Sequence, residues 1–254
     1  MQGPAELLPI SSSGHLILVP AVLGWPYADL DDELRKSFEV ALHAGTAGAL
    51  ALALRHEVAE VLRALDTRRI LGVLLAFMPP ALGAFAFERA IEERAGRPRA
   101  VALAQIGAGL ALAAADRRPA ERSQDEAGVR DHLLIGLGQA AALVPGVSRN
   151  GGSLTAARLR RFDRRAASRL SRHAALPIIV AASGLKGVRL ARRGMPAEIA
   201  LPFATGAAAA FASTLAATRL VAMIDGARSY APFAAYRVAL GACALGRLRR
   251  RVRA

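Results

Sequence analysis

An all-α protein built into a membrane is the fold class that the sequence predicts, and three observations predict it. Hydrophobic residues make up 54% of the 254 residues, and the mean hydropathy is +0.31, both higher than a soluble globular domain needs. Several apolar runs approach the roughly 20 residues that a membrane-spanning helix requires. These runs are too long for strands and are rich in Ala and Leu, which favour helices. We expect one integral membrane domain over residues 1–254.

Six apolar segments are candidates for transmembrane helices. In chain order they are 40–54, 69–87, 100–115, 174–190, 197–224 and 232–245. Many consist of Ala and Gly more than of Leu and Phe, a composition that lets helices pack closely through small faces. The charged stretches 55–68, 88–99 and 116–132 mix acidic with basic residues, as solvated connectors do. The sequence therefore predicts a compact bundle of about six spanning helices.

Two segments, 2–18 (QGPAELLPISSSGHLIL) and 138–154 (GQAAALVPGVSRNGGSL), break the apolar pattern with polar residues and glycine. A shift of 136 positions aligns Leu7 with Leu143, Leu8 with Val144, Pro9 with Pro145, and Ser12 with Ser148. This weak repeat predicts two halves, 1–115 and 132–254, each with its own broken helix. In a membrane, paired broken helices mark a central binding site. The helices after Pro9 and Pro145 would present free N–H groups, which favour a phosphate ligand.

The formal net charge of +14 does not indicate nucleic acid binding, because the basic residues lie between apolar segments and aromatic residues make up only 5%. Segment 158–172 has seven Arg and one Asp, and segment 247–253 has five Arg and no acid. Arginine gathers on cytoplasmic loops, where anionic membrane lipids attract it. We expect both segments to be interfacial anchors, while the broken helices leave the sidedness of the termini open.

The N-terminus has no basic region followed by an apolar run, so no cleavable signal peptide is predicted. Met1 is followed almost at once by the first polar break, where a leading helix would be expected. We therefore expect a truncated N-terminus. The single cysteine, Cys243, excludes an internal disulfide and a multi-cysteine metal site.

The first break concentrates groups that carry chemistry: Glu6, Ser11, Ser12, Ser13 and His15 fall within ten residues. Such polar density is costly in apolar surroundings and indicates function. A hydroxyl beside an imidazole supports nucleophilic or general acid–base catalysis, and a carboxylate can orient the imidazole, act as a base or hold a divalent cation. The alternative is structural, with serines that cap a helix and a histidine bonded to a backbone carbonyl.

The second break places Arg149 after Ser148 and before the run Asn150, Gly151, Gly152 and Ser153. A guanidinium binds phosphate oxygens through parallel hydrogen bonds, and small neighbours let a ligand approach the backbone. The alternative is an interfacial arginine whose head reaches for water. The adjacent glycines and hydroxyls favour the phosphate site.

Together, GPAELLPISSSGHLIL and PGVSRNGGSLTAARL resemble the two signature motifs of the undecaprenyl-diphosphate phosphatase family, also called bacitracin resistance proteins. The resemblance implies a multi-pass enzyme of the bacterial plasma (inner) membrane that converts undecaprenyl diphosphate to undecaprenyl phosphate and so recycles the carrier of cell-wall sugars. It implies six spanning helices and two re-entrant helical hairpins in inverted repeats. It also implies a divalent cation, Mg²⁺ or Ca²⁺. The oligomeric state stays open, with a homodimer as one arrangement.

The resemblance also implies roles for single residues. Gln2 and Glu6 match the family's paired Glu/Gln-x-x-x-Glu element, four residues apart on one helix face, and would bind the cation. Ser12 and His15 are the two candidates for the nucleophile, and Arg149 would stabilise charge on the transferred phosphoryl group. We expect substrate binding from Ser11, Ser13, Ser148, Asn150, Gly151 and Ser153.

The sequence departs from the family pattern at four positions. Asn150 stands where Ser is usual, Ser153 where Thr is usual, and Arg172 and His173 where apolar residues are usual. A charge within the bilayer is costly, so an inactive lipid-binding homologue is an alternative.

Two other classes compete with this interpretation. A polyprenyl-phosphate transporter or flippase would also use inverted repeats around an anion site, but simple transport does not require Glu6, Ser12 and His15 beside an arginine. The type 2 phosphatidic acid phosphatases share SGH and SR signatures but need a histidine soon after the arginine. The first histidine after Arg149 is His173, which is too distant.

Overall fold

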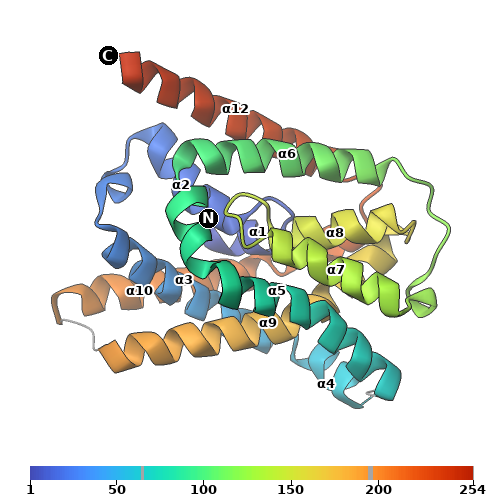
Figure 1. The fold of residues 1–254 in the computed structure, drawn as a ribbon. Helices are drawn as coiled ribbons and strands as arrows, with labels where there is room; N and C mark the ends of the chain where they lie inside the picture. The colour runs from blue at the N-terminus through green and yellow to red at the C-terminus, as the bar shows by residue number, and fades with distance from the viewer. Residues whose placement is uncertain (64–65, 194–196, 254) are drawn as a thin grey trace.

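A computed structural model describes residues 1–63, 66–193 and 197–253, and the described chain is helical (Figure 1). The helices are α1 (Gln2–Leu7), α2 (Ser12–Leu23), η1 (Pro26–Asp29), α3 (Asp32–Ala53), α4 (Arg55–Arg63), α5 (Thr67–Ala95), α6 (Pro98–Asp116), η2 (Gln124–Glu126), α7 (Val129–Ala141), α8 (Arg149–Leu159), α9 (Arg164–Arg193), α10 (Ala197–Ala217), α11 (Arg219–Asp225) and α12 (Ala231–Arg253). Within those ranges the only β-type contact is an isolated bridge between Arg122 and Phe162. The predicted all-α class is confirmed.

Three helices among the described residues are long and apolar enough to cross a membrane: Thr67–Phe87 of α5, Pro98–Asp116 (α6) and Ile199–Ala217 of α10. Apolar side chains also point outward, since Phe85 is 91% exposed and Leu201 72% exposed. Such exposure is expected where lipid replaces water. The predicted single run 197–224 was wrong, because it divides into α10 and α11 at Thr218, where the first helix ends.

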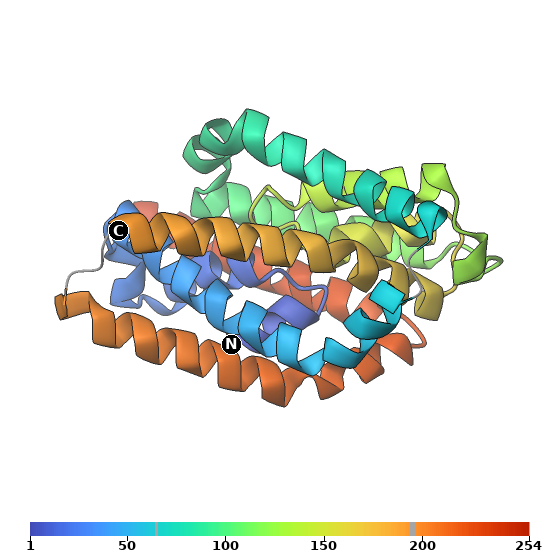
Figure 2. The ribbon, with the colours of Figure 1, turned by 90° about the horizontal axis from the view of Figure 1, so that it is seen from below.

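The helix contacts of the first half of the chain have counterparts when the two halves are interchanged. Helix α5 packs on α7 as α10 packs on α1, and α6 packs on α8 as α12 packs on α2. Helix α6 also packs on α12, and the two run side by side along one edge of Figure 1. Figure 2 shows α3 between α9 and α10, two helices of the second half. Each short-helix pair, α1–α2 and α7–α8, therefore packs against longer helices from both halves of the chain.

Glycine allows the closest of these helix contacts. A Cβ on Gly152 of α8 would overlap the backbone of Gly138 on α7, and a Cβ on Gly45 of α3 would overlap Ala207 on α10. The Ala- and Gly-rich composition therefore produces tight packing, as the sequence predicts.

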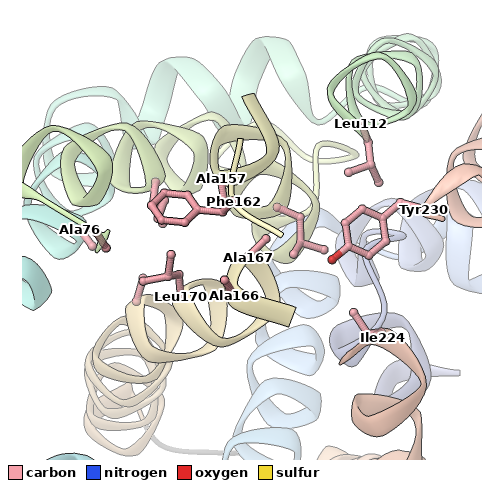
Figure 3. Close-up of a cluster of buried hydrophobic side chains, with 13 residues drawn as sticks. Ala76, Leu112, Ala157, Phe162, Ala166, Ala167, Leu170, Ile224 and Tyr230 are labelled. Atoms are coloured by element: carbon pink, nitrogen blue, oxygen red, sulfur yellow. The ribbon is translucent and has the colours of Figure 1, made fainter. Parts of the chain in front are cut away.

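One end of the bundle is held by a buried apolar cluster and by ion pairs. Figure 3 shows Phe162 and Tyr230 in this cluster, whose other buried members include residues of α5, α6, α7, α8, α9 and α11. Asp116 bonds Arg164 Nε at 2.7 Å and accepts from the Tyr230 amide at 2.8 Å. Arg158 is 1% exposed and donates to the backbone carbonyls of Phe162, Asp116 and Arg118. The prediction that all of segment 158–172 anchors at the interface was therefore wrong for Arg158.

Two further charges of this end are paired. Asp131 accepts from Arg122 Nη2 at 2.7 Å, from the Gly128 amide at 2.9 Å and from Arg160 Nε at 2.7 Å. Burial alone would raise the pKa of Asp131, but these hydrogen bonds outweigh it and hold the pKa well below its usual range. Arg172 bonds Asp225 Oδ1 at 2.7 Å, so the charge that departs from the family pattern has a partner.

Candidate active site

Two serines begin the helices that follow the breaks. Ser11 caps α2 and accepts from the Gly14 amide at 3.2 Å, while Ser148 caps α8 and accepts from the Gly151 amide at 3.1 Å. Both have the positive φ that residues other than glycine rarely adopt, 71° and 69°. The matching caps set the equivalence of the two breaks at a shift of 137, so Ser11 and not Ser12 corresponds to Ser148. The alignment of Ser12 with Ser148 was therefore wrong by one residue.

Glu6 joins the two helix starts. Ser12, the first residue of α2, donates from Oγ to Glu6 Oε2 at 2.5 Å. Arg149, the first residue of α8, donates from Nη2 to Glu6 Oε1 and forms an ion pair with it. The Glu6 side chain is 10% exposed and that of Arg149 is 23% exposed. A hydroxyl, a carboxylate and a guanidinium from two halves of the chain thus meet in a largely enclosed site.

His15 lies one turn further along α2 and is 4% exposed. Its Nδ1 lies 2.7 Å from the Ser11 carbonyl oxygen, and its Nε2 lies 2.7 Å from the Tyr236 hydroxyl on α12. The two rings are also stacked, with centroids 5.5 Å apart. No hydrogen bond joins His15 to Ser12 among the described contacts, so the structure places Ser12 on the carboxylate and His15 on the tyrosine.

Ser13 and Asn150, two of the predicted substrate-binding residues, have contacts within the protein. Ser13 Oγ lies 3.3 Å from Ser11 Oγ at the start of α2. Asn150 instead links elements, since its Nδ2 donates to the Leu7 carbonyl at 2.8 Å and its Oδ1 accepts from Ser171 at 2.9 Å. Both ends of the Asn150 amide are thereby used within the protein.

Ser153 and Gly151 surround the start of α8. Ser153 is fully buried, and its Oγ has no hydrogen-bond partner in the described part of the chain. Gly151 leaves room for a guanidinium, because a Cβ there would meet Arg237 Nη1 at 2.5 Å. A side chain at position 151 would displace that cation.

Gln2 lies on α1 four residues before Glu6 and is 4% exposed. Neither Oε1 nor Nε2 of Gln2 has a hydrogen-bond partner within the described residues. A buried amide without partners is costly in a folded protein. The Gln2 oxygen is therefore available as a ligand for a hard cation.

The sequence-based reasoning missed Arg237 on α12. This arginine is fully buried and donates to the carbonyls of Pro9 at 3.1 Å, Gly146 at 2.9 Å and Val147 at 2.7 Å. It therefore ties both breaks to α12 and adds positive charge behind the start of α8. The signal was an ionisable residue inside the apolar run 232–245, which in a membrane protein indicates function.

The site as a whole favours an anion. The N-termini of α2 and α8, helices of 12 and 11 residues, meet there. Arg149 and Arg237 add two positive charges, against the negative charge of Glu6. A serine hydroxyl on a carboxylate, beside a guanidinium, is an arrangement suited to phosphoryl transfer.

Known proteins resemble this chain over almost its whole length. The family model described as "Bacitracin resistance protein BacA" matches residues 1–243. The undecaprenyl-diphosphatase of Geobacter sulfurreducens is 38% identical over 261 residues, which cover 98% of this chain and 95% of the relative. The undecaprenyl-diphosphatase of Campylobacter concisus is 35% identical over 95% of this chain and 93% of its own. Undecaprenyl-diphosphatase 1 of Rhodospirillum rubrum is 38% identical over 96% and 91%. With a family model that covers almost all of its length, the chain belongs to the bacitracin resistance protein family, BacA.

Proposed function

We propose that this chain hydrolyses undecaprenyl diphosphate to undecaprenyl phosphate and inorganic phosphate, which recycles the lipid carrier for cell-wall synthesis and confers bacitracin resistance. The observation that carries the proposal is the contact of Glu6 with both Ser12 and Arg149, at the starts of two helices. The names of the relatives, which cover more than nine tenths of the chain, support this substrate. A transporter would need the anion site but not the hydroxyl on the carboxylate.

Ser12 is the nucleophile in this proposal. Its Oγ already donates to Glu6, so the carboxylate is placed to take the proton as Oγ bonds to the terminal phosphorus. The bond between that phosphorus and the bridging oxygen breaks, and undecaprenyl phosphate leaves with the bonding electron pair. Water then attacks the phosphoserine, gives a proton to His15 as base, and releases inorganic phosphate while Glu6 returns the first proton to Ser12.

Arg149 and the two helix starts stabilise the charge that develops on the phosphoryl oxygens. The amides at the starts of α2 and α8 and the Arg149 guanidinium are held in place before the reaction, so they need no reorganisation during it. Ser153, whose buried Oγ has no partner in the described residues, is a further hydroxyl for a phosphate oxygen.

For a divalent cation, Mg²⁺ or Ca²⁺, we propose Glu6 and Gln2 as the protein ligands. No cluster of three or more His, Cys, Asp or Glu side chains suited to a metal occurs in the described ranges. Mg²⁺ does not require one, because it keeps several waters and binds substrate phosphates through one or two protein ligands. When bound, the cation supplies positive charge that offsets the diphosphate.

The membrane arrangement that we propose has six spanning helices and two re-entrant hairpins. The three apolar helices are supplemented by α3, α9 and α12, and the broken pairs α1–α2 and α7–α8 are the hairpins. The reciprocal helix contacts support two inverted repeats. We propose the bacterial plasma membrane as the location because the proposed substrate is a membrane lipid that carries cell-wall sugars.

The test is phosphate release from undecaprenyl diphosphate by the detergent-purified chain, with Mg²⁺, with Ca²⁺ and with a chelator. Glu6→Ala, Ser12→Ala and Arg149→Ala should each abolish most release. Glu121→Gln, in an exposed ion pair with Arg161 at 2.7 Å, is the control and should release phosphate at the wild-type rate. Full turnover by Ser12→Ala would exclude Ser12 as the nucleophile, and no release by folded wild-type protein would refute the phosphatase.

A further inference from the structure

Tyr236 of α12 lies against His15. His15 is 4% exposed, whereas Tyr236 is 45% exposed and lies against it. The Tyr236 hydroxyl is 2.7 Å from His15 Nε2, and the rings are nearly parallel, with an interplanar angle of 10°. The tyrosine therefore contacts His15 through both its ring and its hydroxyl.

The contacts of His15 define which nitrogen carries its proton. The Ser11 carbonyl oxygen, 2.7 Å from Nδ1, can only accept a hydrogen bond, so Nδ1 carries the proton and donates. In the neutral imidazole Nε2 is then an acceptor, and the Tyr236 hydroxyl donates to it. Both nitrogens of the ring are occupied by the protein.

We propose that Tyr236 is a positioning residue that fixes the tautomer and the orientation of His15 through its hydroxyl. This inference rests on the proposed function, in which His15 accepts a proton from the attacking water. The hydroxyl donates to Nε2 while Nδ1 donates to the Ser11 carbonyl, so the lone pair that accepts a proton is kept on Nε2. When Nε2 takes the proton from water, the hydroxyl gives up this hydrogen bond and keeps its own proton.

The fold supports this role more than simple packing does. Tyr236 precedes Arg237, whose three hydrogen bonds fix α12 to the carbonyls of both breaks. The hydroxyl is therefore placed by the same element that holds the two helix starts together. A packing residue would need only the ring, and the ring alone would leave Nε2 without a donor.

The experiment compares Tyr236→Phe with Tyr230→Phe in the full-length, detergent-purified protein. Tyr236→Phe keeps the stacked ring and removes the hydroxyl. Tyr230→Phe is the matched control, since its hydroxyl donates to the Arg164 carbonyl at 3.0 Å and not to His15. We expect Tyr236→Phe to lower kcat about tenfold or more, as loss of proton transfer does, with KM within about twofold of wild type. Tyr230→Phe should leave both constants near wild type.

A second readout does not depend on turnover. In ¹⁵N NMR spectra of protein labelled at histidine, with His15→Gln used for assignment, Tyr236→Phe should move the Nε2 resonance of His15 and leave Nδ1 in place. A kcat within about twofold of wild type, or an unchanged Nε2 resonance, would overturn the role of Tyr236 alone. Absence of phosphate release by the wild type would instead overturn the proposed function and the role of Tyr236 with it.

Discussion

Glu6 and Arg149 form one unit in this structure, and we predict that their substitutions are not additive in catalysis. The perturbation is Arg149→Met, Glu6→Gln and the double variant. Loss of one donor to a developing oxyanion lowers kcat about 10²- to 10³-fold, and loss of a general base lowers it about 10²- to 10⁴-fold. Independent residues would therefore give a double variant slower by about 10⁴- to 10⁷-fold.

The structure argues for a smaller combined loss. The Glu6 carboxylate accepts a hydrogen bond from Ser12 at 2.5 Å and pairs with Arg149, so substitution of Glu6 or of Arg149 affects the same carboxylate contact. Loss of either Glu6 or Arg149 therefore disturbs the position of Ser12. We expect the double variant to be about as slow as the slower single variant, within roughly tenfold, because residues of one catalytic unit behave in this way.

The assay is the initial rate of phosphate release at saturating undecaprenyl diphosphate, with thermal unfolding measured on each variant. The control cycle uses Arg161→Met and Glu121→Gln, an ion pair whose side chains are 49% and 48% exposed. That pair should change neither rate nor stability, because surface ion pairs contribute about 0–1 kcal/mol. A double variant whose loss equals the product of the two single losses would refute the unit.

Three further predictions concern packing, cation binding and acid. Gly152→Ala should lower the free energy of unfolding by about 1–3 kcal/mol in denaturant unfolding, because the added methyl group overlaps Gly138. A smaller decrease in the free energy of unfolding would show that α7 and α8 separate freely. Gln2→Glu should lower the Mg²⁺ concentration for half-maximal activity and make unfolding temperature depend on Mg²⁺, and an unchanged Mg²⁺ titration would remove Gln2 from the cation site. Asp131 has a folded pKa below its ordinary 3.8, so its stabilisation is fully present above that value and is lost as pH falls through the lower folded pKa. Thermal unfolding should therefore show the largest advantage of wild type over Asp131→Asn at neutral pH, and an advantage that is no smaller at pH of about 2 would contradict the assignment.

Helix positions followed from the sequence because the length and composition of an apolar run are local properties. The segments 69–87 and 100–115 lie within α5 and α6. The division of 197–224 was not predictable in the same way, since the residues around Thr218 remain largely apolar. The short helix α11 there carries Asp225, the partner of Arg172, and that pairing joins residues 53 positions apart.

The site was predictable where its members lie inside the two breaks. Glu6, Ser12 and Arg149 were expected together and are together. Tyr236 and Arg237 were not expected, because they reach the breaks from α12 across more than 200 and about 90 positions of sequence. Local spacing carries no information about such contacts.

The one-residue error in the repeat explains how this scaffold combines symmetry with chemistry. An alignment by residue type pairs Ser12 with Ser148, since both are serines. The backbone pairs Ser11 with Ser148 as caps, so the next positions, Ser12 and Arg149, become equivalent. Each is the first residue of its helix, and each contacts a different oxygen of Glu6. Two similar backbones thus bring a hydroxyl and a guanidinium to one carboxylate, and the difference in chemistry lies in the single side chain that each helix start presents.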